Sequence, residues 1–191
     1  MADLTGSYRL GPDAGRVIVT TGRAGLAAKV GHDLELEITR WSADISVPAE
    51  ENGGLAAATI TAELDLGSLA VRSGSGGARP LTESDRRDIQ STMRKLLPAG
   101  GSAAAVFRST RIIPATGGGS AAGGAIEGTL TLNGRSQPAR LQVTNPAPGR
   151  YRASAPVVQS AFGIKPYQGF FGALKLRDEV GVEVEVNLDR S

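Results

Sequence analysis

The sequence predicts an all-β protein in which antiparallel strands with one apolar face close into a barrel or stack as a sandwich. Hydrophobic and polar residues alternate along most of the chain, and only one segment has clear helical spacing. The 26 glycines exceed the ordinary share of about 7%, which favours turns between many short strands. The length of 191 residues suits one domain over residues 1–191.

The alternation predicts the strands in order. They are His32–Ile38, Trp41–Val47, Leu55–Leu66, Ala103–Ile113, Ile126–Leu132, Ala139–Val143, Tyr151–Val157 and Val180–Leu188. The phase slips near Arg40, as it does at a tight turn or a bulge. Asn133-Gly134 lies between two alternating segments and predicts a two-residue hairpin turn.

The inward faces of these strands combine apolar residues with many small ones. The small ones are Ala58, Ala62, Gly128, Ala139, Ala153 and Ala155, and only 4% of the chain is aromatic. Small inward residues leave space for a cavity, although two tightly packed sheets would also use them. Leu34, Leu36, Trp41, Phe107 and Leu130 are therefore candidate contacts for a ligand in the interior.

Glu83–Leu97 is the one segment with strong helical spacing. Its apolar stripe is Ile89, Met93 and Leu97, Thr82 or Ser84 can cap its start, and Pro98 ends it. We expect this helix to lie against one opening of the barrel, where Ile89 and Met93 contact a ligand. Arg86 and Arg87 in its first turn are either solvated charges or a site for an anionic head group. A second, short helix is expected around Gly22–Lys29.

The segment Ser160–Ala173 is unusually aromatic. It holds Phe162, Phe170 and Phe171, three of the four phenylalanines in the chain. Such a segment either packs on the core as an ordinary loop or covers the barrel opening and contacts a ligand.

Catalytic and metal sites find little support. The chain has one histidine and no cysteine, so multi-histidine and thiolate metal sites are excluded, and we expect no metal and no cofactor. His32 fits a hydrogen-bonded polar residue at a strand end or a residue that lines a cavity. The net charge of +2 is small and the basic residues are dispersed, so we expect no nucleic-acid binding.

The first residues lack the basic and apolar regions of a secretory signal. No apolar run approaches the ~18 residues that a membrane-spanning helix needs. These observations predict a cytoplasmic protein without a membrane span.

Several short motifs, in their order and spacing, resemble the YceI-like family of polyisoprenoid-binding, lipocalin-like proteins. They are Gly31-His32-Asp33, Arg87-Asp88-Ile89 with Met93, Phe107–Thr110, Glu127–Gly134, Phe162–Ile164 and Lys175–Val180. The resemblance runs from about Gly6 to Leu188. It implies an extended antiparallel lipocalin-like barrel of about eight strands, a helix near one opening, a long apolar cavity for a polyprenyl chain and, in many members, a homodimer.

Together these observations predict a non-catalytic carrier or sequestering protein for an isoprenoid or another long apolar lipid. Its polar end, a pyrophosphate or a quinone, would sit near Arg86, Arg87 or His32. The alternatives are an enzyme of unknown chemistry on the same barrel, and a ligand-free structural or protein-interaction domain.

Overall fold

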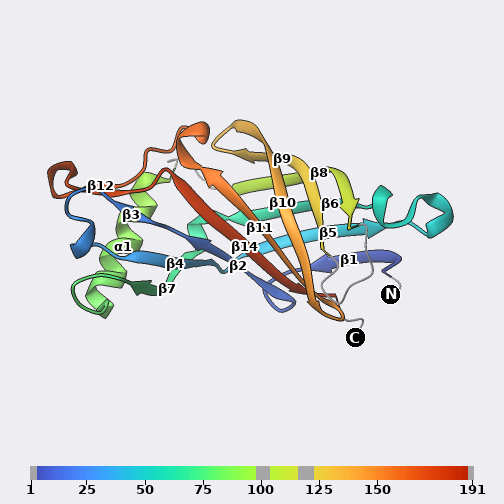
Figure 1. Ribbon diagram of the computed structural model, residues 1–191, viewed down its shortest axis with the longest axis horizontal. Coiled ribbons are helices and arrows are strands. Elements are labelled where there is room, and N and C mark those ends of the chain that lie inside the picture. Colours follow the sequence, from blue (N-terminus) through green and yellow to red (C-terminus); the bar gives the residue numbers. More distant parts are fainter. Residues whose placement is uncertain (1–3, 98–103, 116–122, 189–191) are drawn as a thin grey trace.

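The computed structural model describes residues 4–97, 104–115 and 123–188. Most of them form one curled antiparallel sheet (Figure 1). The neighbour order in this sheet is β1-β5-β6-β8-β9-β10-β11-β14-β2-β4-β7. The bounds are β1 Gly6–Leu10, β2 Gly15–Thr20, β4 Asp33–Ile38, β5 Trp41–Val47, β6 Thr59–Asp65, β7 Leu69–Ser75, β8 Ala104–Pro114, β9 Gly124–Leu132, β10 Arg135–Ala147, β11 Arg150–Val158 and β14 Glu179–Asn187.

Three pairs of these strands are halves of longer segments, so the eleven strands correspond to eight continuous runs of chain. β1 leads into β2, β4 into β5 and β6 into β7 through short interruptions. Because β4 pairs with β2 while β5 pairs with β6, the order of neighbours closes on itself. The all-β barrel class expected from the sequence is thereby confirmed.

The interruption between β4 and β5 is the phase slip expected near Arg40. The Arg40 amide donates to Ser68 Oγ over 2.9 Å, and Ser68 Oγ donates to the carbonyl oxygen of Asp65 over 2.6 Å. Ser68 is buried and belongs to the 3₁₀ turn Leu66–Ser68 that joins β6 to β7. At the bend, the Arg40 amide and the Asp65 carbonyl would otherwise lack a partner in the buried interior. The single buried hydroxyl of Ser68 bonds both of them, so the neighbouring segments β4–β5 and β6–β7 can bend at the same place.

The hairpin between β9 and β10 also forms as expected. Asn133 and Gly134 have φ values of 53° and 69°, the left-handed conformation that a type I′ turn requires at both central positions. Asn133 additionally donates from Nδ2 to the carbonyl oxygen of Phe162 over 2.9 Å.

The helix α1, Glu83–Leu96, lies between β7 and β8 in the chain and agrees with the expected helix to one residue. Thr82 and Asp85 form a capping box at its start. One side of the helix is held against β7, because Arg86 donates to the carbonyl oxygens of Val71 and Arg72 and Gln90 donates to that of Leu69. No helix in the described ranges is long and apolar enough to cross a membrane.

A small second sheet lies at the same end of the molecule as α1 (Figure 1), which we call the helical end. It consists of β12 (Gln168–Gly169), β13 (Leu174–Leu176) and β3 (Arg23–Ala24), in that order. The short helix expected around Gly22–Lys29 is therefore wrong. Arg23–Ala24 pairs with β13, and only the 3₁₀ turn Ala28–Val30 follows, because Gly25 with a φ of 91° breaks any helical run.

The buried core is divided into three clusters rather than one. The largest contains Leu10, Val17, Ile38, Trp41 and Ala43, where the bent segments meet. Inward side chains of β10 and β11 remain only half-buried. The middle of the barrel is therefore hollow.

Candidate functional site

A cavity of about 1110 Å³ occupies the interior of the barrel. This volume lies slightly above the range of about 300–1,000 Å³ that is usual for ligand pockets. Inward side chains of most strands form its wall, and the great majority are aliphatic. A space of this size and lining suits a long apolar molecule.

Five of the six small inward residues noted in the sequence lie along this wall, whereas Gly128 is covered by the ring of Phe107 and does not. Ala58, Ala62, Ala139, Ala153 and Ala155 all line the cavity. On β10, β11 and β14 their neighbours are of modest size as well, including Val143, Val182 and Val184. These positions explain why the interior is open, since no large side chain reaches across from them.

Eight of the twelve candidate ligand contacts line the cavity. They are His32, Leu34, Leu36, Trp41, Ile89, Met93, Phe107 and Leu130. They come from β4 and the residue directly before it, β5, α1, β8 and β9, so the structure gathers residues that are far apart in the chain. Contact between them and a ligand stays a prediction.

The other four candidates are placed elsewhere. Phe162 is buried in a core cluster with Ala105 and Leu132, and Phe171 points into solvent. Arg87 lies on α1 but is not part of the wall. The side chain of Phe170 lies outside the described part of the structure.

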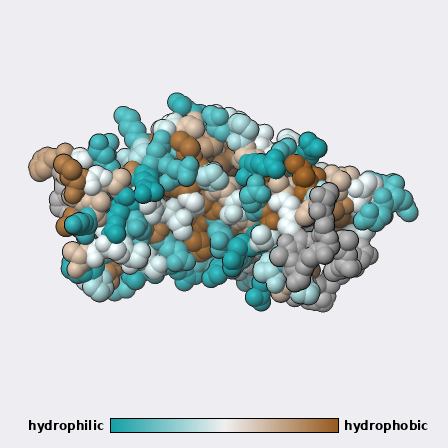
Figure 2. Space-filling view, viewed as in Figure 1, coloured by the Kyte–Doolittle hydropathy of each residue, from teal (hydrophilic) through white to brown (hydrophobic). Residues whose placement is uncertain are grey.

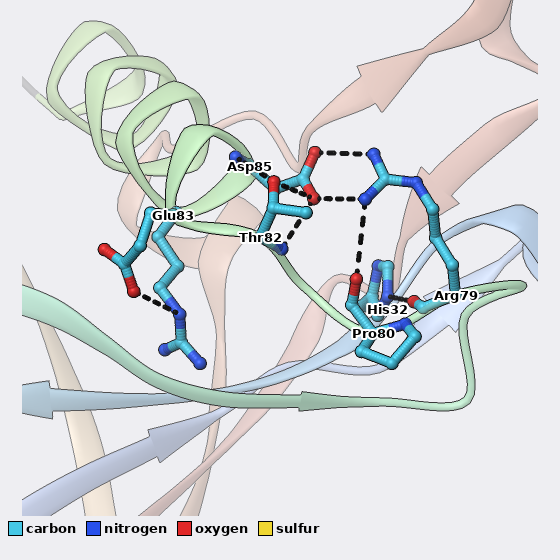
Figure 3. Close-up of polar contacts among 7 residues, drawn as sticks. His32, Arg79, Pro80, Thr82, Glu83 and Asp85 are labelled. Carbon is cyan, nitrogen blue, oxygen red and sulfur yellow. Dashed lines mark hydrogen bonds and ion pairs between the residues drawn. The ribbon is translucent and has the colours of Figure 1, made fainter.

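A polar cluster interrupts the apolar wall at the helical end (Figure 3). Arg79 binds Asp85 through two hydrogen bonds, Nη1 to Oδ2 over 2.8 Å and Nη2 to Oδ1 over 2.9 Å. Asp85 also accepts the Thr82 amide over 2.8 Å. The Arg79 guanidinium, helped by Thr82, holds the pKa of the Asp85 carboxyl well below its usual range.

His32 is part of the same cluster. Its Nε2 lies 2.7 Å from the carbonyl oxygen of Arg79, and because a carbonyl can only accept, Nε2 carries the proton. Gly77 lies against the imidazole ring so closely that a Cβ there would collide with it. A glycine is therefore needed for the segment before α1 to cover His32.

The ionisable groups of the wall carry no excess positive charge at the helical end. Arg79 is the one cationic residue in the described wall, and Asp85 neutralises it. Asp88 also lines the wall, and no partner for its carboxylate is found among the described residues. Thr92, Gln159 and Tyr167 supply further polar groups at the helical end, together with Thr21 just before β3.

Arg86 does not provide the anion site considered from the sequence. Its guanidinium bonds the carbonyl oxygens of Val71 and Arg72 over 3.1 and 2.9 Å and lies 3.6 Å from Glu83. It therefore docks the helix onto the sheet edge.

Sequence reasoning missed Arg79 and Asp85. The Thr82-x-x-Asp85 spacing signals a capping box, but nothing in the pattern shows that Arg79 folds back onto it. Within the described residues, no group of three or more acidic or histidine side chains is arranged to hold a metal ion.

Comparisons with known proteins agree with this geometry. The family model of the YceI-like domain matches residues 8–188. The crystal structure of Burkholderia cenocepacia BcnA is similar, with a TM-score of 0.57 and 16% identity over 90% of this chain and 94% of that one. A polyisoprenoid-binding domain from Saccharophagus degradans, implicated in plant cell wall breakdown, gives a TM-score of 0.52 and 11% identity over 92% and 95%. A search of curated protein sequences found no match.

Proposed function

We propose that this chain, which belongs to the YceI-like family, holds a long apolar lipid such as an isoprenoid inside its barrel. The observation that carries the proposal is the aliphatic cavity of about 1110 Å³. The proposed role is non-catalytic, as a carrier or a sequestering protein. A cytoplasmic location and a homodimeric state stay predictions.

The wall favours affinity through burial rather than through specific polar contacts. Each methylene moved from water into an apolar site contributes about 0.8 kcal/mol. A chain of several isoprene units would therefore bind tightly to a wall made mainly of Val, Leu, Ile and Ala. Such a wall does not discriminate strongly between apolar chains, so we expect related lipids to compete.

The Saccharophagus degradans domain supports the ligand class, because it is described as polyisoprenoid-binding. At 11% identity the likeness shows the fold alone, and the ligand is proposed for this chain on the cavity itself.

The polar cluster favours an uncharged head group over a pyrophosphate. Arg79 is already paired with Asp85, and Asp88 adds negative charge to the wall. The two segments outside the described ranges on either side of β8, 98–103 and 116–122, contain no ionisable side chain. The hydroxyl groups of Thr92 and Tyr167 offer hydrogen bonds to a neutral polar end instead. Gln159 can contribute only its amide oxygen, because its Nε2 already donates to the carbonyl oxygens of Arg177 and Asp178.

The first test is to identify what the protein carries. Native mass spectrometry of freshly purified protein, followed by organic extraction, should reveal a lipid adduct. Delipidated protein should then bind a fluorescent polyprenyl probe saturably at micromolar concentration. Folded protein that carries nothing and binds no probe would favour the ligand-free structural role.

A matched pair of variants ties the probe to the cavity. Ala153→Phe adds a ring to the wall, whereas Ser154→Phe adds the same ring to the outer face of the same strand. We expect the first variant to lose at least tenfold in probe affinity and the second to keep it. Equal affinities would place the probe outside the barrel.

Head-group preference is tested with ligands of equal chain length. A polyprenol should bind at least as tightly as the corresponding pyrophosphate, and Arg86→Gln should not change their ratio. A pyrophosphate preference that Arg86→Gln abolishes would restore the anion site considered from the sequence.

A further inference from the structure

Two loops of the small sheet present fully exposed apolar side chains at the helical end. Leu26 precedes the 3₁₀ turn Ala28–Val30, and Phe171 lies between β12 and β13; both side chains are fully exposed. The loops are joined, because the Ala27 amide donates to the carbonyl oxygen of Ala173 over 2.9 Å. We call Leu26, Val30 and Phe171 the apolar tip.

The backbone at Phe171 is strained. Its φ and ψ of 55° and 33° are left-handed, a conformation that is uncommon for a bulky residue. Strain of this kind persists where the surrounding structure enforces it, and it is concentrated at functional positions. At Phe171 the strained backbone holds the aromatic ring in water. In the isolated protein, no burial of the ring offsets the cost of that strain.

The apolar tip adjoins the cavity. Val30 is 51% exposed and also lines the cavity wall, as do Gly31 and His32 directly after it. On the other loop, Leu174 and Leu176 of β13 line the wall three and five residues after Phe171. A residue that is both exposed and part of the wall marks a place where the interior meets the surface. Arg79 and Leu96 are likewise exposed wall residues at the helical end, and Leu55 and Pro114 are exposed wall residues at the opposite end.

The charge around the apolar tip is positive. Residues 21–32 and 163–177 contain five basic residues and no acidic one. Arg23 is paired with Asp33, while Lys29, Lys165, Lys175 and Arg177 have no ion-pair partner in the described ranges. Asp178, the nearest acid beyond the second segment, accepts hydrogen bonds from Ser160.

We propose that the helical end docks on the surface of a lipid bilayer containing anionic lipids, with Leu26 and Phe171 inserted among the acyl chains. The unpaired cations face the lipid phosphates. Figure 2 shows hydrophobic atoms gathered at the end that carries β12. Docking there would bring the cavity end lined by Val30 and His32 to the membrane, so that a lipid could pass between bilayer and barrel without crossing water.

A bilayer fits this surface better than a folded protein does. A stable protein interface buries at least about 1,000 Å² with matching shapes, whereas the apolar tip consists of a few side chains that protrude from two loops. A fluid bilayer accepts protruding side chains without shape complementarity, and basic residues beside an apolar anchor add attraction to anionic lipids.

Co-sedimentation with vesicles tests the proposal. Delipidated protein is mixed with vesicles of phosphatidylcholine and phosphatidylglycerol in equal amounts, and with vesicles of phosphatidylcholine alone. We expect stronger association with the anionic vesicles and weakening as salt is raised, because salt screens the lysines. No association with anionic vesicles at low salt overturns the proposal.

Phe171→Asn is the most selective variant, because asparagine tolerates the left-handed backbone while removing the ring. With Leu26→Ser it should lower vesicle affinity about tenfold or more without lowering the thermal midpoint. The double variant Lys29→Gln with Lys175→Gln should lower vesicle affinity about thirtyfold, because each cation contributes roughly fivefold. The control variant Arg9→Gln with Arg150→Gln removes the same charge from β1 and the start of β11, away from the small sheet (Figure 1). It should change vesicle affinity little.

The outcomes separate this inference from the proposed function. Neither Leu26 nor Phe171 lines the cavity, so their variants should bind the soluble polyprenyl probe normally. Lost probe binding with intact vesicle binding would refute the proposed cargo alone. Equal losses in the Arg9/Arg150 control would refute docking at the helical end. A wild-type dimer that the Phe171 variant dissociates, without vesicle binding, would assign the apolar tip to a second copy of the chain.

Discussion

Filling the cavity should raise the thermal stability of the protein substantially. The three core clusters leave the side chains of β10 and β11 half-buried around an open interior, and a bound chain would complete their burial. The perturbation is the addition of a polyprenyl probe to delipidated protein.

The size of the effect follows from linkage. A ligand at about 100 times its dissociation constant stabilises the folded state by about 2.7 kcal/mol. For a domain of this length, 1 kcal/mol moves the melting temperature by about 2–4 °C. We therefore expect a rise of about 5–11 °C.

Differential scanning calorimetry over a series of probe concentrations is the assay, because the midpoint should keep rising with concentration beyond saturation. Ser154→Phe should reproduce the wild-type rise, while Ala153→Phe should show a smaller rise at each concentration. A midpoint that does not depend on probe concentration, with probe binding confirmed separately, would refute the view that the ligand completes the core.

Three further predictions concern the polar cluster, the helix α1 and the expected absence of a metal. Because the folded-state pKa of Asp85 is depressed, its contribution to stability is present above the unfolded value of about 3.9 and is lost as the pH falls through the folded value. Urea titrations from pH 7 to pH 2 should accordingly show a shallower acid loss in Asp85→Asn than in wild type. Ile89→Asp forces a charge toward the apolar wall, so fluorescence titration should show weaker probe binding together with less helix by circular dichroism; unchanged binding would separate α1 from the site. Dialysis against a chelator should leave the melting temperature within about 1 °C, and a larger loss restored by one metal would contradict the expected absence of a metal.

The sequence predicts eight of the eleven strands of the main sheet, because the period-2 pattern records which side of a barrel each residue faces. It does not predict β1, β2 or β7, and the expected strand Leu55–Leu66 begins only at Thr59, because Gly54–Ala57 forms a 3₁₀ turn. A break in the same pattern predicts the Arg40 bend, and the Asn-Gly dipeptide, which tolerates left-handed backbone, predicts the turn at Asn133-Gly134. The sequence predicts eight wall residues correctly as inward, since inward positions and cavity positions coincide when the middle is hollow.

The failures lie where local pattern carries no information. Arg23–Ala24 forms a strand only because β13, about 150 residues later, supplies its partner. Phe162 and Phe171 belong to one aromatic segment, yet the 3₁₀ turn Gln159–Phe162 buries the first and a left-handed backbone exposes the second. Arg86 donates to backbone carbonyl oxygens of β7. This contact depends on how the helix packs against the sheet, and helical spacing in the sequence does not predict that packing.

The hollow interior also sets how the protein should respond to hydrostatic pressure. Unfolding under pressure is driven by the loss of internal voids, and ordinary proteins shrink by about 20–100 mL/mol. If the cavity of about 1110 Å³ held nothing, its volume would correspond to about 670 mL/mol. This is several times the largest volume decrease of about 100 mL/mol that is usual on unfolding. A barrel filled with lipid or water has no such volume to lose. Compression therefore distinguishes an evacuated interior from an occupied one, and resistance to it would be conferred by the cargo.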